Sequence, residues 1–215
     1  MNIIFSSHKN AEHREVVEKM LKKYSSSKIT NIYSKECISK INPETSYDLL
    51  ISDGTQFIFV APTLKNVKTA MNSHPSMLPL HKGSQPIFWA TLLEDPLGIS
   101  IHQISEKIDE GDVFYQKRIN YKEEDTFSYI HGLCRKEIFS GIESIVILIN
   151  QQKNPLPFTI DPKLLDKHPP EFHHKKVDCF NLLKKLPHGW NTTIGDARKI
   201  LEKDLVNYKF KNQLR

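Results

Sequence analysis

The sequence has few cysteines, no long apolar run and no glycine-rich nucleotide motif. Its 215 residues contain three cysteines, Cys37, Cys134 and Cys179, which are widely spaced and form no CxxC pair. This pattern suits a reducing compartment and argues against a zinc site, so we expect no metal. No apolar stretch reaches about 18 residues, which excludes a membrane-spanning helix. Charged residues follow the apolar start directly, unlike a secretory signal. We therefore expect a cytoplasmic protein with no membrane partner.

Three catalytic or nucleotide-binding motifs are also missing. The sequence contains no GxGxxG, no GxxxxGK[ST] and no GxSxG. Dinucleotide and NTP sites of the common types are therefore not indicated, and neither is a serine nucleophile. The three cysteines lack neighbouring residues that would activate a thiol. The chemistry must come from other polar side chains.

The net charge of +5 is confined to the end of the chain. Residues 161–215 carry 12 basic and 7 acidic side chains, whereas residues 1–160 carry 18 of each. A neutral body with a basic tail suits docking or a dimer interface better than duplex binding, so we expect no nucleic-acid partner. The alternative is a non-catalytic protein that binds nucleic acid through this tail.

Apolar runs alternate with amphipathic segments, the pattern of an α/β domain with a mostly parallel sheet. Strands are expected over residues 2–5, 29–33, 47–51, 98–102 and 113–119, and helices over 11–24, 86–93 and 125–151. Pro62 predicts a short helix to residue 69, and the prolines from 75 to 86 predict a shaped loop from residue 71. Thr126 or Asp125 is the expected N-cap of the long helix.

The last quarter of the chain is different. Prolines crowd residues 155–170 and predict a linker, followed by two short helices over 177–186 and 195–206. We therefore expect a catalytic domain over residues 1–150 and a small C-terminal extension over 151–215, with a possible role in dimerisation.

The densest polar cluster surrounds Asn72 and His74. Pro75 excludes the helical region for His74, so the segment is extended and both side chains point to the same face. The amide can stabilise an oxyanion and the imidazole can move a proton. Asp109, 35 residues beyond His74, could orient the imidazole. The alternative is structural: Asn72 and Asp109 capping turns, and His74 a satisfied histidine.

Four ordered blocks now carry a resemblance. They are Asn72-Ser73-His74-Pro75-Ser76-Met77-Leu78-Pro79; then Lys82-Gly83, Pro86 and Trp89; then Gly98-x-Ser100-x-His102; then Ile108-Asp109-Glu110-Gly111-Asp112. Together they resemble the 10-formyltetrahydrofolate-dependent formyltransferases, whose pattern is Asn-x-His-Pro-Ser-Leu-Leu-Pro followed by Asp-x-Gly. The resemblance covers roughly residues 47–119. It implies a Rossmann-like sheet flanked by helices, with 10-formyltetrahydrofolate as co-substrate.

The resemblance also implies roles for single residues. Asn72 would hold the formyl oxygen as it becomes an oxyanion, His74 would relay the proton from the attacking amine, and Asp109 would orient His74 and a water. The pterin would pack against two loops, for which the candidates are Gln56, Phe57, Ile58, Val60, Ile108 and Gly111. The alternative for the residues 57–60 is a core strand.

Two features indicate the branch of the family: the length of the segment after the long helix and one further sequence motif. Only about 65 residues follow the long helix, which is short for the tRNA-binding domain of methionyl-tRNA formyltransferases. The Gly83-x-x-Pro86-x-x-Trp89 run and the tail are most similar to sugar N-formyltransferases, which implies a homodimer. The expected acceptor is a nucleotide-linked sugar, for example a dTDP-4-amino-4,6-dideoxyhexose for O-antigen.

The candidates for the acceptor side are His81, Lys82 and Trp89, because a lysine can pair with a diphosphate and an aromatic ring can stack on a base. For Trp89 we favour helix packing over ligand contact. The rival enzymatic functions are formylation of glycinamide ribonucleotide or of methionyl-tRNA.

Overall fold

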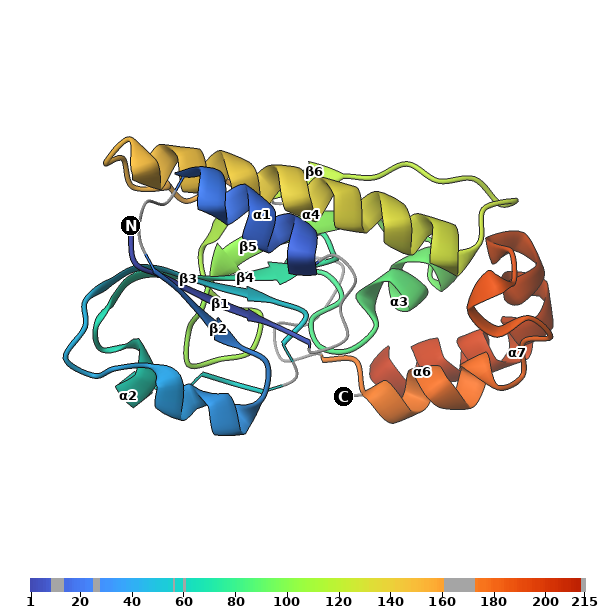
Figure 1. The fold of residues 1–215 in the computed structure, drawn as a ribbon. Coiled ribbons are helices and arrows are strands. Elements are labelled where there is room, and N and C mark those ends of the chain that lie inside the picture. Colours follow the sequence, from blue (N-terminus) through green and yellow to red (C-terminus); the bar gives the residue numbers. More distant parts are fainter. Residues whose placement is uncertain (9–13, 25–27, 56, 60, 161–172, 214–215) are drawn as a thin grey trace. The chain divides into compact units, whose positions relative to one another are not determined.

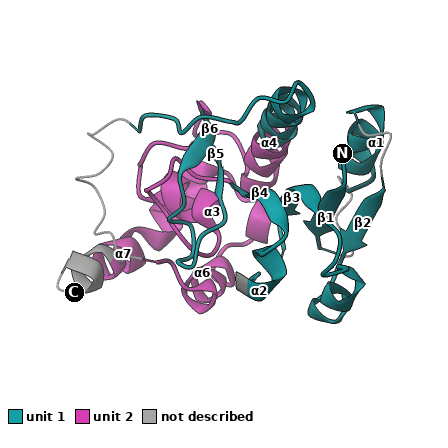
Figure 2. Ribbon diagram, turned by 90° about the vertical axis from the view of Figure 1, so that its left-hand side faces the viewer, with its two compact units in different colours: residues 1–74, 100–116, 137–160 teal, residues 75–99, 117–136, 161–215 magenta. Residues whose placement is uncertain are grey.

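The computed structural model of the chain describes residues 1–8, 14–24, 28–55, 57–59, 61–160 and 173–213. The chain divides into two compact units, each assembled from separate segments (Figure 2). Unit 1 comprises residues 1–74, 100–116 and 137–160, and unit 2 comprises residues 75–99, 117–136 and 161–215.

A six-stranded sheet, almost all of it in unit 1, has the order β2-β1-β3-β4-β5-β6. Its strands are β1 (Ile3–Ser7), β2 (Ile29–Ile32), β3 (Tyr47–Asp53), β4 (Val67–His74), β5 (Gly98–Gln103) and β6 (Val113–Arg118). The first four are parallel, and β5 is antiparallel to β4. The predicted α/β fold with a mostly parallel sheet is confirmed.

Strand β4 corrects the prediction for residues 62–74. The helix opened by Pro62, α2, covers only Ala61–Leu64, and the chain from Val67 to His74 is a strand. This segment hydrogen-bonds to β3 along one edge, and its last four residues pair with β5 along the other. These partners lie far away in the sequence, so local spacing could not reveal them. The expected loop after residue 71 therefore begins after His74.

Helices cover both faces of the sheet in unit 1 (Figure 1). Helix α1 (Arg14–Tyr24) and the C-terminal half of α4 (Phe127–Asn150) lie on one face, where the Tyr24 hydroxyl donates to Glu143 at 3.1 Å. The 3-10 helix η1 (Lys35–Lys40) and α2 lie on the other. Ile4 and Leu50 belong to the apolar cluster on the η1 side, and because side chains alternate along a strand, their neighbours point to α1.

Unit 2 contains α3 (Pro86–Leu92), the start of α4, α6 (Lys176–Leu183), η2 (Gly189–Asn191) and α7 (Ile194–Gln213). Every side chain of α3 is buried, and Phe88 stacks on Phe127 with ring centroids 5.2 Å apart. Thr126 caps α4, since its hydroxyl accepts from the Tyr129 N–H at 3.2 Å. The two helices predicted near the C-terminus are present, and α7 continues to Gln213, beyond the predicted end at residue 206. Within the described ranges, every helix is too short or too polar to cross a membrane.

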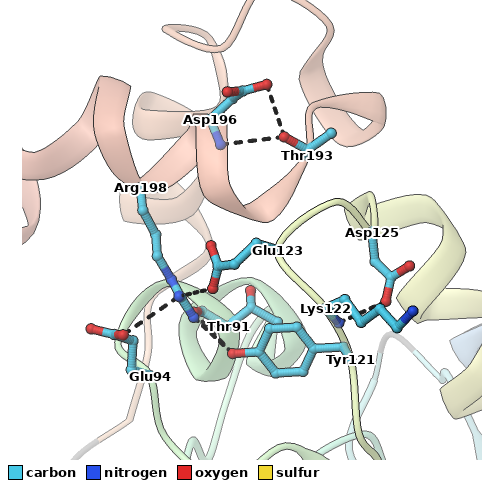
Figure 3. A network of polar contacts seen from close by, with 9 residues as sticks. All are labelled: Thr91, Glu94, Tyr121, Lys122, Glu123, Asp125, Thr193, Asp196 and Arg198. Atoms are coloured by element: carbon cyan, nitrogen blue, oxygen red, sulfur yellow. Dashed lines mark hydrogen bonds and ion pairs between the residues drawn. The ribbon is translucent and has the colours of Figure 1, made fainter.

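Arg198 ties α7 to the rest of unit 2 (Figure 3). Its Nε donates to the Thr91 carbonyl at 3.0 Å, and one terminal nitrogen donates to the Tyr121 hydroxyl at 2.8 Å. The other terminal nitrogen pairs with Glu123 and, at 3.5 Å, with Glu94. The guanidinium thus joins the end of α3, residues 121–123 and α7 through one planar group.

We expect Arg198→Met to lower the free energy of unfolding by about 2–3 kcal/mol, because it deprives the Thr91 carbonyl and the Tyr121 hydroxyl of a charged donor. Urea denaturation measures the change. Glu94→Gln is the matched control: the Glu94 side chain is 69% exposed, so the expected loss is below about 1 kcal/mol. Equal losses for the two variants would contradict this account.

The three cysteines should differ in reactivity. Burial raises the pKa of Cys134 and of Cys179 to about 12, whereas the hydrogen bond from the Ser34 hydroxyl lowers the pKa of Cys37. We expect iodoacetamide at neutral pH to label Cys37 first, because the thiolate is the reacting form. Peptide mapping measures the order of labelling, and Ser34→Ala should slow the reaction of Cys37. First labelling at Cys134 would contradict the prediction.

Candidate active site

Polar side chains gather where the parallel strands end. Ser6, Ser52, Asn72 and His102 lie opposite one another in register across β1, β3, β4 and β5. Residues at matching register positions share one face of a sheet, so the four form a row on the η1 side. The carboxyl ends of parallel strands are where α/β folds place their ligands. This row therefore marks the candidate active site of unit 1.

Asn72 is oriented by His102. Its amide nitrogen lies 3.2 Å from His102 Nε2, while His102 Nδ1 lies 2.8 Å from the carbonyl oxygen of Gln103. Because a carbonyl can only accept, Nδ1 carries the proton, and Nε2 of the neutral ring accepts from Asn72. An amide has two N–H donors, so Asn72 can hold His102 with one and a ligand oxygen with the other.

Asp109 places one carboxylate between two imidazoles. Its Oδ2 lies 3.6 Å from His74 Nδ1, and its Oδ1 lies 3.5 Å from His102 Nε2. All three side chains are more than nine-tenths buried. In a site that excludes water, the negative charge of Asp109 interacts with positive charge on the His74 ring far more strongly than it would at the surface. The arrangement is suited to moving a proton at His74.

The loop that carries Asp109 is shaped by its close approach to β5. Asp109 itself has a left-handed backbone with φ of 56°. At Gly111 a Cβ atom would lie 1.9 Å from the Gln103 carbonyl oxygen, a distance no side chain can accept. The Gln103 N–H donates to the Asp112 carbonyl at 2.8 Å and closes the turn between β5 and β6. Gly111 thus lets the Asp109 carboxylate reach the histidines.

The structure brings together the three residues predicted to be catalytic, Asn72, His74 and Asp109, and adds His102. The sequence contained a signal for it, since Gly98-x-Ser100-x-His102 alternates like a strand and puts Ser100 and His102 on one face. Ser100 accepts a hydrogen bond from the Gln116 side chain at 2.9 Å. What the sequence lacked was the pairing of β5 with β4.

The predicted cofactor residues that the structure describes lie on two loops of unit 1. Phe57 packs against the apolar core cluster and contacts Phe59 edge-on at 5.2 Å. Ile58 and Ile108 are 59% and 49% exposed, unusual for large aliphatic side chains. Gly111 lies in the tight turn described above. Gln56 and Val60 lie outside the described residues.

The three residues predicted for the acceptor side all lie in unit 2, where they are buried. The Trp89 ring stacks on His174 and on Tyr208 with centroid distances of 4.8 and 4.1 Å. Trp89 therefore packs inside the unit, as favoured from the sequence. Among the residues that the structure describes, no three His, Cys, Asp or Glu side chains gather as a metal site.

Comparison with known proteins gives a family match over residues 5–138, to the model described as Formyl transferase. Among curated relatives, a methionyl-tRNA formyltransferase of Ehrlichia ruminantium (strain Gardel) is 26% identical over 188 residues, 83% of this chain and 60% of that protein. GDP-perosamine N-formyltransferase of Brucella melitensis biotype 1 is 30% identical over 107 residues, 48% of this chain and 41% of that protein. The chain thus spans less than two thirds of these relatives.

A solved structure shares the fold over most of the chain. The formyltransferase PseJ from Anoxybacillus kamchatkensis, in complex with UDP-4,6-dideoxy-4-formamido-L-AltNAc and tetrahydrofolate, is 24% identical, with a TM-score of 0.71 over 92% of this chain and all of that chain. A 4-N formyltransferase from Francisella tularensis is 17% identical, with a TM-score of 0.62 over 85% of this chain and 79% of that chain. The mixed six-stranded sheet is therefore that of formyltransferases.

Replacing Gly111 should displace the Asp109 loop. We expect Gly111→Ala to lower the free energy of unfolding by about 1–3 kcal/mol, because the new methyl group overlaps the Gln103 carbonyl. Gly132→Ala is the matched control, since Gly132 lies in α4 with open space around it and should gain about 0.5–1 kcal/mol. Thermal or urea unfolding of both variants measures the difference, and an unchanged stability for Gly111→Ala would contradict the tight approach.

Proposed function

Because the chain belongs to the formyl transferase family, we propose that it transfers a formyl group from 10-formyltetrahydrofolate to the amino group of a nucleotide-linked amino sugar. The observation that carries the proposal is the Asp109 carboxylate between His74 and His102, with Asn72 alongside. Acyl transfer to an amine can use an amide donor for the oxyanion, an imidazole for the proton and a carboxylate that orients the imidazole.

In the proposed mechanism, Asn72 stabilises the oxyanion. Attack of the amine on the formyl carbon turns the carbonyl oxygen into an oxyanion. The Asn72 amide, already held on one side by His102, donates its second N–H to that oxygen. Because the amide is fixed before the reaction, no reorientation is needed as charge develops. The role of His102 is to position Asn72.

His74 moves the proton. The attacking nitrogen loses a proton as the new C–N bond forms, and the folate nitrogen gains one as its bond to the formyl carbon breaks. His74 can take the first proton and deliver the second, so the sum of the two steps leaves the imidazole unchanged. The Asp109 carboxylate lies 3.6 Å from His74 Nδ1, where its negative charge stabilises the protonated ring and orients the imidazole.

The loops that flank Asp109 offer a place for the pterin. Ile58 and Ile108 are exposed aliphatic side chains in unit 1, and we propose that they form apolar walls for the flat ring. Phe57 supports this surface from the core, and the turn at Gly111 brings backbone groups to its edge. Gln56 and Val60 remain predicted contacts.

For the acceptor, we propose a nucleotide-linked 4-amino-4,6-dideoxyhexose, with a dTDP-linked sugar for surface polysaccharide such as O-antigen as the first to test. The 4-formamido-4,6-dideoxy sugar in the PseJ structure and the GDP-perosamine enzyme support this class. His81 and Lys82 would lie on the acceptor side. We further propose a homodimer in which residues 151–215 take part. Methionyl-tRNA is the second candidate acceptor, favoured by the curated relatives that match most of the chain.

We expect the purified chain to release tetrahydrofolate from 10-formyltetrahydrofolate when a dTDP-, UDP- or GDP-linked 4-amino-4,6-dideoxyhexose is supplied. His74→Ala should lower kcat/KM by about 100- to 10,000-fold, because the proton relay is lost. Asn72→Ala should lower it by about 100- to 1,000-fold, because the oxyanion donor is lost. His188→Ala, at an exposed histidine of unit 2, is the control and should leave kcat/KM unchanged.

Two results would count against the proposal. Formylation of glycinamide ribonucleotide or methionyl-tRNA, with no turnover of any amino-sugar nucleotide, would sink the sugar acceptor. Full activity of His74→Ala on whichever acceptor reacts would refute the assigned mechanism.

A further inference from the structure

Unit 2 contains two buried histidines, His81 and His174, which are far apart in the sequence and hydrogen-bonded to each other. Their exposed fractions are 1% and 3%, and His81 Nδ1 lies 2.8 Å from His174 Nε2. His174 Nδ1 lies 2.7 Å from the Tyr208 hydroxyl oxygen, and His81 Nε2 lies 3.4 Å from Asp95 Oδ2. A polar chain therefore runs from α7 through both rings to the segment after α3.

With both rings neutral, one arrangement of protons puts a donor on the His81 nitrogen that faces Asp95. The Tyr208 hydroxyl donates to His174 Nδ1, and His174 Nε2–H donates to His81 Nδ1. His81 then carries its proton on Nε2, which faces the Asp95 carboxylate. Each ring nitrogen has one defined role, so the chain fixes the orientation of both imidazoles.

Trp89 packs against the Tyr208 end of this series of hydrogen-bonded side chains. The His174 and Tyr208 rings, hydrogen-bonded to each other, both stack on its ring, at interplanar angles of 5° and 16°. Trp89 is fully buried in α3, so the stack holds His174 against a rigid helix. The His174 ring is thus fixed both by its edge and by its face.

The backbone of His174 in turn fixes the loop that contains Lys82. The His174 N–H donates to the Lys82 carbonyl at 2.9 Å, and the Ser84 N–H donates to the His174 carbonyl at 3.0 Å. Gly83, with φ of 87°, has no room for a side chain, because a Cβ atom would lie 2.7 Å from the His174 carbonyl oxygen. These contacts form a short parallel bridge between Gly83 and His174.

We propose that His174 is a positioning residue for the acceptor, holding the loop over residues 81–84 in the conformation that recognises the diphosphate of a nucleotide sugar. This inference rests on the proposed function, which places Lys82 on the acceptor side. Every contact that carries it lies within unit 2, whereas Asn72, His74 and Asp109 lie in unit 1. Loss of the His174 contacts should therefore weaken acceptor binding and leave the binding of 10-formyltetrahydrofolate unchanged.

The test compares His174→Phe with His174→Gln in the full chain by steady-state kinetics. Phenylalanine keeps the stack on Trp89 but loses both ring nitrogens, so the acceptor KM should rise about tenfold or more, while the KM of the folate co-substrate should change by less than about twofold. Glutamine can place an amide donor near the position of Nε2 and renew the bond to His81, so the acceptor KM should return to within about threefold of wild type.

A second variant and a second measurement guard against a general loss of folding. Tyr208→Phe keeps the stack and removes only one hydroxyl, so it should raise the acceptor KM in the same direction by a smaller factor. Arg198→Met, which weakens unit 2 through other contacts, should leave the ratio of the two KM values unchanged. Hydrogen exchange should show faster exchange of the Ser84 amide in His174→Phe and not in Arg198→Met.

Two outcomes would overturn the positioning role while wild type turns over an amino-sugar nucleotide. In one, His174→Phe changes both KM values equally; in the other, it leaves the acceptor KM unaltered. Either outcome leaves the proposed function intact. If wild type formylates no amino-sugar nucleotide, the proposed function fails, and the stated role for His174 in sugar recognition fails with it. Exchange of the Ser84 amide then separately decides whether His174 holds the loop, and an unchanged rate would overturn that part also.

Discussion

Asp109 holds one carboxylate between two buried imidazoles, and this depends on the antiparallel pairing of β4 with β5. The pairing sets Asn72 opposite His102 and His74 opposite Ser100, so two histidines from distant segments face the same side of the sheet. The connection between β5 and β6 then brings the Asp109 carboxylate to within 3.6 Å of His74 and 3.5 Å of His102. Asn72 gains its orientation from His102, which takes its tautomer from the Gln103 carbonyl.

Burial strengthens the electrostatic interactions within this cluster, and it also makes an unpaired polar group costly. A carboxylate taken out of water is costly unless positive charge or hydrogen-bond donors compensate it. Asp109 has His74 Nδ1 at 3.6 Å from one oxygen, and Asp53, on the opposite face of the sheet, accepts from the Ser73 hydroxyl. Neighbouring residues of β4 thus point to different faces: Asn72 and His74 point to the candidate site, and Ser73 points to the opposite face, where it pairs with Asp53.

In unit 2, paired polar groups with little exposure join segments that are far apart in the sequence. Arg198 and the His81–His174 pair are both nearly buried polar groups that join distant segments, and both bring the C-terminal residues against α3 or the segments that flank it. Burial of α3 on every side makes it a rigid reference for these contacts. The basic C-terminal segment therefore contributes specific internal structure and not only charge.

The sequence by itself determined the alternation of strands and helices, because apolar periodicity reports directly which face of an element is buried. It also identified Asn72 and His74, since Pro75 forces an extended backbone that puts both on one face. Asp109 could be proposed only through its spacing from that motif. In each case the signal lies within a few residues or in a motif of fixed order.

Tertiary structure decided the rest. Residues 67–74 form a strand only because β3 and β5 supply hydrogen-bond partners, which no local pattern contains. His102 joins the site through that same pairing, and His174 reaches His81 across 93 positions. Contacts between residues far apart in the sequence depend on the register of strands and the packing of helices. The sequence therefore specified which groups could do the chemistry, and the fold specified which of them meet.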